Sequence, residues 1–117
     1  MTGGYDILRK HTRLFMVPGM YHCNQGPGPN FFDALGALEQ WVEHGRPPEG
    51  ISATKYTHDD RAQPALRTMP LCSFPTQARY AGDGDVNSAA NWSCTANQDL
   101  LQVGPNGTRA GLGGPAR

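Results

Sequence analysis

The chain has 117 residues and a formal net charge of zero, with ten Lys and Arg balanced by ten Asp and Glu. Because the basic residues are spread along the chain from Arg9 to Arg117, neither a nucleic-acid-binding surface nor attraction to an anionic membrane is expected. No apolar run approaches the roughly 20 residues that span a bilayer, and the first residues lack the basic and apolar segments of a signal peptide.

Glycine and proline together make up about a fifth of the chain, well above their usual share. These residues contribute little to a hydrophobic core, and the length allows one small domain at most. The three cysteines leave one thiol without a partner if the other two pair. We therefore expect a piece of a larger fold rather than a self-sufficient domain.

The first half of the chain predicts a strand, a loop and a helix, an α/β pattern. Residues Arg13–Val17 are mostly apolar and are followed by a Pro-Gly pair, as in a buried strand that ends in a turn. The glycines and prolines of residues 20–30 predict a loop. Asn30 is the expected N-cap of a helix and Gly45 its C′ residue. The helix has apolar residues at helical spacing, namely Phe31, Leu35, Leu38 and Val42, flanked by Ala34 and Trp41.

The second half has a weaker pattern. Residues Ile51–Tyr56 predict a second strand. Residues 57–94 show no sustained period and contain three prolines, so we expect an irregular extension. The composition of residues 103–117 predicts a disordered tail rich in Gly, Pro, Ala and Arg, which leaves residues 1–102 as the structured part.

His22 is the strongest candidate for chemistry. It lies in the loop between the predicted strand and the predicted helix. In α/β-hydrolases the catalytic residues follow the order nucleophile, acid, histidine, and the histidine lies on a loop after a late strand. The alternative is an ordinary polar loop residue, which is how we interpret His11, His44 and His58.

Two blocks of the sequence resemble the C-terminal portion of the tannase and feruloyl esterase family. The similarity covers about residues 12–94, with several uncommon motifs in the order and spacing of the family. The first block comprises residues Arg13–Cys23, Gly26–Asn30 and Phe32–Glu43. The second comprises Arg67–Pro75, Ala78–Tyr80, Gly82, Gly84–Asp85 and Ala89–Cys94.

This resemblance implies an α/β-hydrolase sheet, of which the chain would hold the C-terminal strand, histidine loop and helix, extended by an irregular segment stapled by a disulfide. It also implies a secreted or periplasmic serine esterase that hydrolyses aromatic esters, such as gallates or hydroxycinnamates, through an acyl-enzyme. His22 matches the catalytic histidine of the family, which takes the proton of the serine and returns it to the leaving alcohol.

The resemblance also implies roles for all three cysteines. Cys23 matches the cysteine that the family pairs with another cysteine immediately before the nucleophilic serine. Such a bond would fix nucleophile and base at hydrogen-bonding distance. Cys72 and Cys94 match a second family pair and are expected to bond to each other. The partner of Cys23 is absent from this chain.

Other parts of the family pattern are missing. The sequence has no Gly-x-Ser-x-Gly elbow, and Ser73 follows the histidine in chain order and lacks flanking glycines. Asp6 is too close to His22 to be the acidic member of the triad. The lid domain, which carries a calcium site in the family, is also absent, so no cofactor or metal is expected. Asp83–Asn87 is only superficially similar to a calcium loop and is interpreted as a polar turn.

Three functional hypotheses follow. The leading one is the C-terminal part of a tannase-type serine esterase that carries His22 and is inactive alone. The second is a non-catalytic module that docks on a separate serine-bearing chain through its apolar helix face. A thiol hydrolase using Cys23 and His22 is disfavoured, because neighbouring side chains in extended structure point apart.

Overall fold

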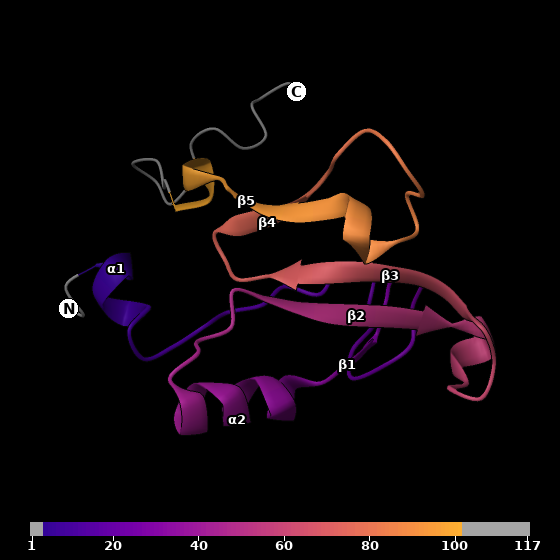
Figure 1. Cartoon of the computed structure of the whole chain (residues 1–117), viewed down its shortest axis with the longest axis horizontal. Coiled ribbons are helices and arrows are strands. Elements are labelled where there is room, and N and C mark those ends of the chain that lie inside the picture. The colour runs from indigo at the N-terminus through magenta and orange to yellow at the C-terminus, as the bar shows by residue number, and fades with distance from the viewer. Residues whose placement is uncertain (1–3, 102–117) are drawn as a thin grey trace.

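A computed structural model describes residues 4–101 as two small antiparallel sheets and one long helix (Figure 1). The three-stranded sheet has the order β1 (Phe31–Phe32), β2 (Gly50–Tyr56), β3 (Ala65–Cys72). The second sheet pairs β4 (Thr76–Tyr80) with β5 (Trp92–Ala96). The helices are α1 (Tyr5–Leu8) and α2 (Ala34–His44), with short 3₁₀ turns at Thr57–Asp59, Ala89–Asn91 and Gln98–Leu101.

The core of the described residues lies where β2 and β3 pair. Ala53 of β2 is completely buried and is paired with Met69 of β3. Leu71 and Cys72, at the end of β3, are also buried. So small a core stabilises a fold only weakly. Among residues 4–101 no helix is long and apolar enough to cross a membrane.

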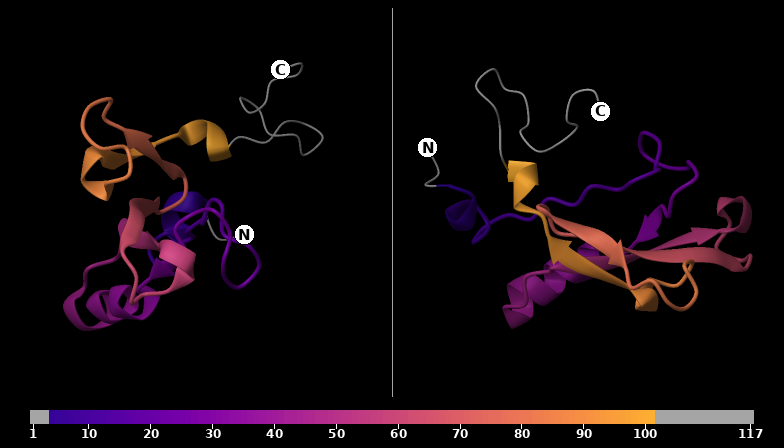
Figure 2. Two further views of the ribbon diagram at one scale, coloured as in Figure 1. Left: turned by 90° about the vertical axis from the view of Figure 1, so that its right-hand side faces the viewer. Right: turned by 90° about the horizontal axis from the view of Figure 1, so that it is seen from above.

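A disulfide between Cys72 and Cys94 joins β3 to β5 and so connects the two sheets. The expected pairing is therefore present. Next to it, the rings of Tyr80 and Trp92 lie 5.4 Å apart, and the Arg67 guanidinium lies 5.9 Å from the Trp92 ring. In the left view of Figure 2, β4 and β5 lie to one side of the three-stranded sheet. Hydrogen bonds from the Thr68 amide to the Asn87 carbonyl (2.9 Å) and from the Ala89 amide to the Thr68 hydroxyl (2.8 Å) add to the disulfide.

Helix α2 starts later than the sequence predicted. Asp33, not Asn30, caps it, because the Asp33 carboxylate accepts a hydrogen bond of 2.8 Å from the Gly36 amide. Residues Phe31–Phe32 instead pair with β2. The predicted C-terminal glycine is correct, since Gly45 ends the helix in the left-handed region with φ of 64°.

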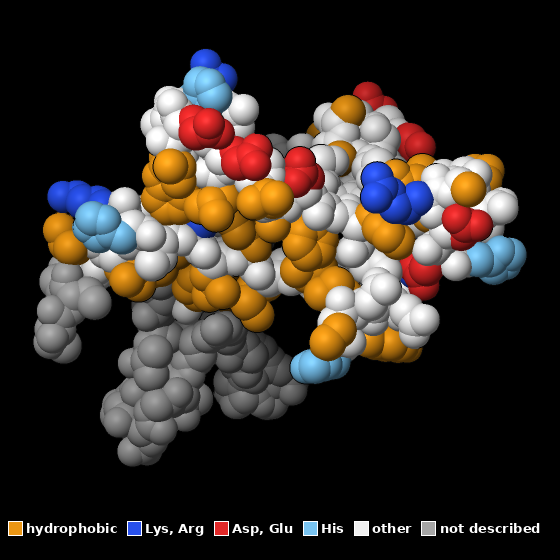
Figure 3. Space-filling view, turned by 90° about the horizontal axis from the view of Figure 1, so that it is seen from below, with side chains coloured by type: hydrophobic (Ala, Val, Ile, Leu, Met, Phe, Trp, Pro, Cys, Tyr) orange, Lys and Arg blue, Asp and Glu red, His pale blue; other side chains and the backbone are white. Residues whose placement is uncertain are grey.

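The apolar stripe of α2 lies on the surface of the described structure. Leu35, Leu38 and Val42 are 67%, 52% and 76% exposed. Trp41 flanks this stripe, and the Arg13 guanidinium sits 4.9 Å from the centre of its ring. Figure 3, which views the side of the molecule where α2 lies, shows hydrophobic side chains gathered at the surface. Large exposed apolar patches are typical of protein interfaces.

The prediction of a buried strand at Arg13–Val17 is wrong. This segment runs extended but makes a single bridge, between Phe15 and Ser73, and Leu14 and Met16 are 51% and 61% exposed. A strand needs a ladder of hydrogen bonds with a neighbour, and the residues described here offer this segment no such neighbour along its length.

The prediction of an irregular extension over residues 57–94 is also wrong, because β3, β4 and most of β5 lie within it. Pro70 weakened the strand pattern, but β3 is an edge strand, where proline is tolerated. The strand predicted at Ile51–Tyr56 is confirmed as β2. The predicted tail, residues 103–117, lies outside the described residues.

Candidate active site

His22 lies in a loop that leaves the body of the structure and returns to it before β1. The right view of Figure 2 shows this loop, in purple, projecting beyond the sheets. Two backbone hydrogen bonds close it, from the Tyr21 amide to the Gln25 carbonyl (3.1 Å) and from the Gly28 amide to the Gly19 carbonyl (2.9 Å). We call residues 19–28 the His22 loop.

The base of the His22 loop requires glycine. A Cβ atom at Gly28 would collide with the carbonyl oxygen of Pro18, and Gly19 has a φ of 80°. At the tip, Cys23 and Gln25 have φ values of 72° and 65°, a region that side chains other than glycine rarely adopt. Strained backbone of this kind clusters at functional sites and persists where surrounding contacts hold it in place.

The structure brings His22 and Cys23 together. Both side chains are exposed, and the Cys23 Sγ lies 3.0 Å from the His22 Nδ1. The expectation that these neighbours point apart assumed extended backbone and is wrong, because the left-handed conformation of Cys23 turns its side chain toward the imidazole. Cys23 is a free thiol.

No other triad member is found beside His22 within residues 4–101. No carboxylate of these residues makes a hydrogen bond with the imidazole. Ser73 is completely buried, so its hydroxyl cannot meet a substrate. The site as described can therefore accept and donate a proton at the imidazole, but it holds no hydroxyl nucleophile at that position.

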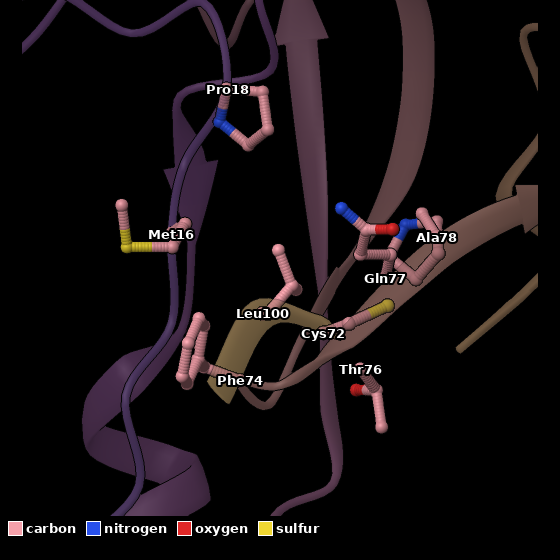
Figure 4. Close-up of a pocket in the computed structure, with 9 residues that line it drawn as sticks. Met16, Pro18, Cys72, Phe74, Thr76, Gln77, Ala78 and Leu100 are labelled. Carbon is pink, nitrogen blue, oxygen red and sulfur yellow. The ribbon is translucent and has the colours of Figure 1, made fainter. Parts of the chain in front are cut away.

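The cavities lie away from the imidazole. One cavity, of about 420 Å³, is shown in Figure 4 and is bounded by Met16 and Pro18 on one side and by residues of β3 and β4 on the other. A second, of about 320 Å³, lies against the base of the His22 loop and is lined by Gly19, Gly28 and Arg67 among others. His22 lines neither of these two cavities.

The described residues contain no group of three or more side chains of the types His, Cys, Asp and Glu placed to hold a metal ion. In the turn that was compared with a calcium loop, the Asp83 carboxylate accepts a hydrogen bond of 2.9 Å from the Gly84 amide. The Asp85 carboxylate accepts one of 2.9 Å from the Asn87 amide. These oxygens stabilise a polar turn.

Sequence reasoning missed a polar cluster under the His22 loop. It consists of Asn24, Asn30, Lys55 and Asp59, which we call the anchor cluster. Lys55 Nζ lies 2.5 Å from Asp59 Oδ1. The hydrogen bond and charge of Lys55 hold the pKa of the Asp59 carboxyl below its ordinary value of 3.8. The only sequence signal was the spacing of four between Lys55 and Asp59, which is common on any surface.

The family model for tannase and feruloyl esterase matches residues 2–95. The mono(2-hydroxyethyl) terephthalate hydrolase of Piscinibacter sakaiensis is 51% identical over 85 residues, which cover 73% of this chain and 14% of the relative. A probable feruloyl esterase of Arthroderma benhamiae is 40% identical over 96 residues, which cover 79% of this chain and 17% of the relative. The chain thus spans roughly a sixth of the length of these curated relatives.

Solved structures agree with the sequence match. An esterase from Aspergillus oryzae superposes with a TM-score of 0.68 at 29% identity, over 79% of this chain and 21% of the esterase. Feruloyl esterase B from the same organism superposes with a TM-score of 0.63 at 26% identity, over 77% of this chain and 20% of that protein. The similarity extends through both sequence and fold, and the chain belongs to the tannase and feruloyl esterase family.

Proposed function

We propose that this chain provides the histidine part of a serine carboxylic ester hydrolase with an α/β-hydrolase sheet. The observation that carries the proposal is that the family match over residues 2–95 includes an exposed His22 on a tightly closed loop. The nucleophilic serine and the acidic residue are assigned to a part of the enzyme beyond these 117 residues, since the chain spans only 14% of the terephthalate ester hydrolase it matches.

His22 acts as the general base and then as the general acid. As the serine Oγ bonds to the ester carbonyl carbon, the imidazole takes the hydroxyl proton. When the carbon–oxygen bond to the alcohol breaks, the imidazole returns that proton to the alcohol. Water then hydrolyses the acyl-enzyme with His22 as base, which regenerates the serine. An imidazole suits both transfers because its pKa lies near neutral pH.

Whether an acidic residue can reach the His22 Nδ1 depends on which group Cys23 contacts. In this structure the Cys23 Sγ faces the His22 Nδ1, the atom that an acidic triad member must contact. In the proposed enzyme, Cys23 bonds to a cysteine beside the serine, which ties the two loops together and leaves the Nδ1 for the carboxylate. This bond and the Cys72–Cys94 disulfide both require an oxidising compartment, so we assign the enzyme to a secreted or periplasmic location.

The substrates are esters of aromatic carboxylic acids. One relative is named for a terephthalate ester and another is named a probable feruloyl esterase. These names share an aromatic acyl group joined to an alcohol. We therefore propose a hydroxycinnamate, gallate or related aromatic acyl group for this enzyme.

The test is reconstitution. The chain is expressed under oxidising conditions, alone or together with the serine-bearing part of the Piscinibacter sakaiensis hydrolase from which the matched C-terminal region has been removed. Hydrolysis of methyl ferulate, methyl gallate and mono(2-hydroxyethyl) terephthalate is then measured. We expect turnover only when both parts are present. Equal turnover by the chain alone would contradict the proposal.

A second candidate function is favoured by the 3.0 Å contact between Cys23 Sγ and His22 Nδ1, which is within reach of proton transfer from a thiol. In a thiol hydrolase Cys23 would attack the ester itself. The chain alone would then hydrolyse esters, and Cys23→Ala would abolish that turnover. In the serine mechanism, the same substitution leaves the chain alone as inactive as before.

A further inference from the structure

The anchor cluster connects the His22 loop to the turn that follows β2. Lys55 Nζ, at the end of β2, donates a hydrogen bond of 2.7 Å to the Gly26 carbonyl inside the loop. It also pairs with Asp59 Oδ1. The same carboxylate oxygen accepts a hydrogen bond of 3.1 Å from Asn30 Nδ2. Asn30 Nδ2 in turn donates 2.8 Å to Asn24 Oδ1.

Two connections thus run from the Lys55–Asp59 pair to the loop. The direct one ends at Gly26, four positions after His22, and the indirect one passes through Asn30 to Asn24, two positions after His22. Asn24 Oδ1 also accepts the Gln25 amide at 2.7 Å, inside the turn that carries the histidine. Both connections therefore fix the segment that directly follows His22.

Three of the four members of the cluster are at least partly shielded from solvent, whereas Asn24 and His22 are exposed. Asn30 is 8% exposed, and the side chains of Lys55 and Asp59 are 15% and 25% exposed. Hydrogen bonds that involve charged groups are stronger than neutral ones, and partial burial limits screening by salt. The orientation of the Asn30 amide is also fixed, since both of its partners are acceptors.

Both of the segments that the cluster connects contain residues with left-handed backbone conformations. Cys23 and Gln25 are left-handed in the loop, and His58 and Asp59 are left-handed in the turn, with φ values of 55° and 56°. Such conformations persist only where contacts hold them. The anchor cluster provides contacts to both segments.

We propose that Lys55 and Asp59 are positioning residues, which hold the His22 loop in the conformation that presents the imidazole for catalysis. The expected effect on catalysis rests on the proposed function, whereas the expected effect on the conformation of the His22 loop does not. A base displaced by even about 1 Å loses much of its effect on rate, whereas substrate affinity depends on other groups. Loss of the pair therefore reduces kcat and leaves KM nearly unchanged.

The first test uses amide hydrogen exchange on the full chain. Lys55→Met and Asp59→Asn are compared with Arg9→Met, a control that breaks a different ion pair, the one between Arg9 and Glu49. The reporters are the Tyr21 and Gly28 amides, which close the loop. We expect their exchange to become at least tenfold faster in the two anchor variants and to stay unchanged in the control.

The amides of Ser73 and Phe74 show whether the effect is local. They bond to the carbonyls of Glu49 and Leu14, away from the anchor cluster. Unchanged exchange at Tyr21 and Gly28, or equal acceleration at all four amides, would overturn the positioning role. Lys55→Arg keeps a cation and several donors and is expected to restore most of the protection.

The second test measures kinetics in the reconstituted enzyme. We expect Lys55→Met and Asp59→Asn to lower kcat at least tenfold with KM changed less than twofold, and Lys55→Arg to recover much of the loss. An unchanged kcat would overturn the inference. If no variant or wild-type mixture hydrolyses esters, the proposed function has failed, and the exchange experiment still decides whether the pair holds the loop.

Discussion

The β4–β5 sheet and the His22 loop are attached to the three-stranded sheet in opposite ways. A disulfide joins β5 to β3, whereas the His22 loop is held by hydrogen bonds from Lys55 and Asn30. A covalent bond keeps its two strands together whatever else opens. Hydrogen bonds and one ion pair can open and close, so the loop is free to adjust its conformation. The covalent bond thus fixes the arrangement of the two sheets, whereas the hydrogen bonds hold the His22 loop reversibly.

The largest effect on stability is expected from Cys72→Ser combined with Cys94→Ser. The bond closes a loop with a sequence separation of 22, and its loss should lower the free energy of unfolding by about 3 kcal/mol on the chain-entropy model. Thermal unfolding followed by circular dichroism measures this. Protection of the β4 and β5 amides against hydrogen exchange should fall most. A larger loss of protection at the Tyr21 amide than at the Ala78 amide would contradict the view that the disulfide mainly stabilises the β4–β5 sheet.

Gly28→Ala tests the loop without touching the disulfide. The added methyl group would meet the Pro18 carbonyl oxygen, so the base of the His22 loop must shift, at a cost of about 1–3 kcal/mol. Hydrogen exchange at the Tyr21 amide should accelerate while the β4 amides keep their protection. Gly45→Ala is the control, because it strains a left-handed glycine at the end of α2, outside the His22 loop. Equal effects of the two substitutions on the loop would contradict the account.

Acid should loosen the His22 loop before it loosens the disulfide-linked sheet. The pKa of Asp59 in the fold lies below its ordinary value of 3.8, chiefly because of the hydrogen bond from Lys55, with a further contribution from Asn30. The stabilisation by this carboxylate is therefore complete above about pH 3.8 and is lost as pH falls through its pKa in the fold. Exchange or NMR shifts of the loop amides between pH 5 and about 2 measure this. In Asp59→Asn the transition should be absent, and an identical transition there would assign it to another group.

The smallest effect on the stability of the chain alone is expected from Val42→Lys. Val42 is 76% exposed, so its replacement removes few contacts. The free energy of unfolding should change by less than about 0.5 kcal/mol. Association with the serine-bearing part should weaken much more if the exposed face of α2 is buried there. Glu43→Lys, a charge change at an exposed neighbour on the same helix, is the control. Equal weakening by both variants would point to charge rather than apolar contact.

Local sequence patterns predict the helices, strands and turns whose formation depends on residues close together in the chain. The helix, its terminal Gly45 and the strand at residues 51–56 follow from spacing and turn residues. Residue Asn30 was assigned as a helix cap, but the structure places it in the anchor cluster because its amide meets Asp59, 29 positions later. The failed strand at Arg13–Val17 has the same cause, since strand formation depends on a neighbour that sequence pattern does not reveal.

The site was partly accessible to sequence reasoning. The sequence motifs predict His22 and Cys23 as candidate site residues, but they do not predict the contact between them, which depends on the left-handed backbone of Cys23. The strands β3 to β5 were missed because Pro70 and the turn-rich stretch between β4 and β5 hid their alternation. Contacts between distant residues and unusual backbone angles are set by the fold as a whole, so local patterns carry little information about them.

The most direct test of the central claim is ester hydrolysis by the reconstituted enzyme with His22→Ala against His44→Ala. His44 is an exposed histidine at the end of α2, so its loss controls for a general effect of removing imidazole. We predict that His22→Ala lowers kcat at least about a thousandfold and that His44→Ala leaves it unchanged. Turnover that survives His22→Ala, or that falls equally in both variants, would contradict the assignment of His22 as the catalytic base.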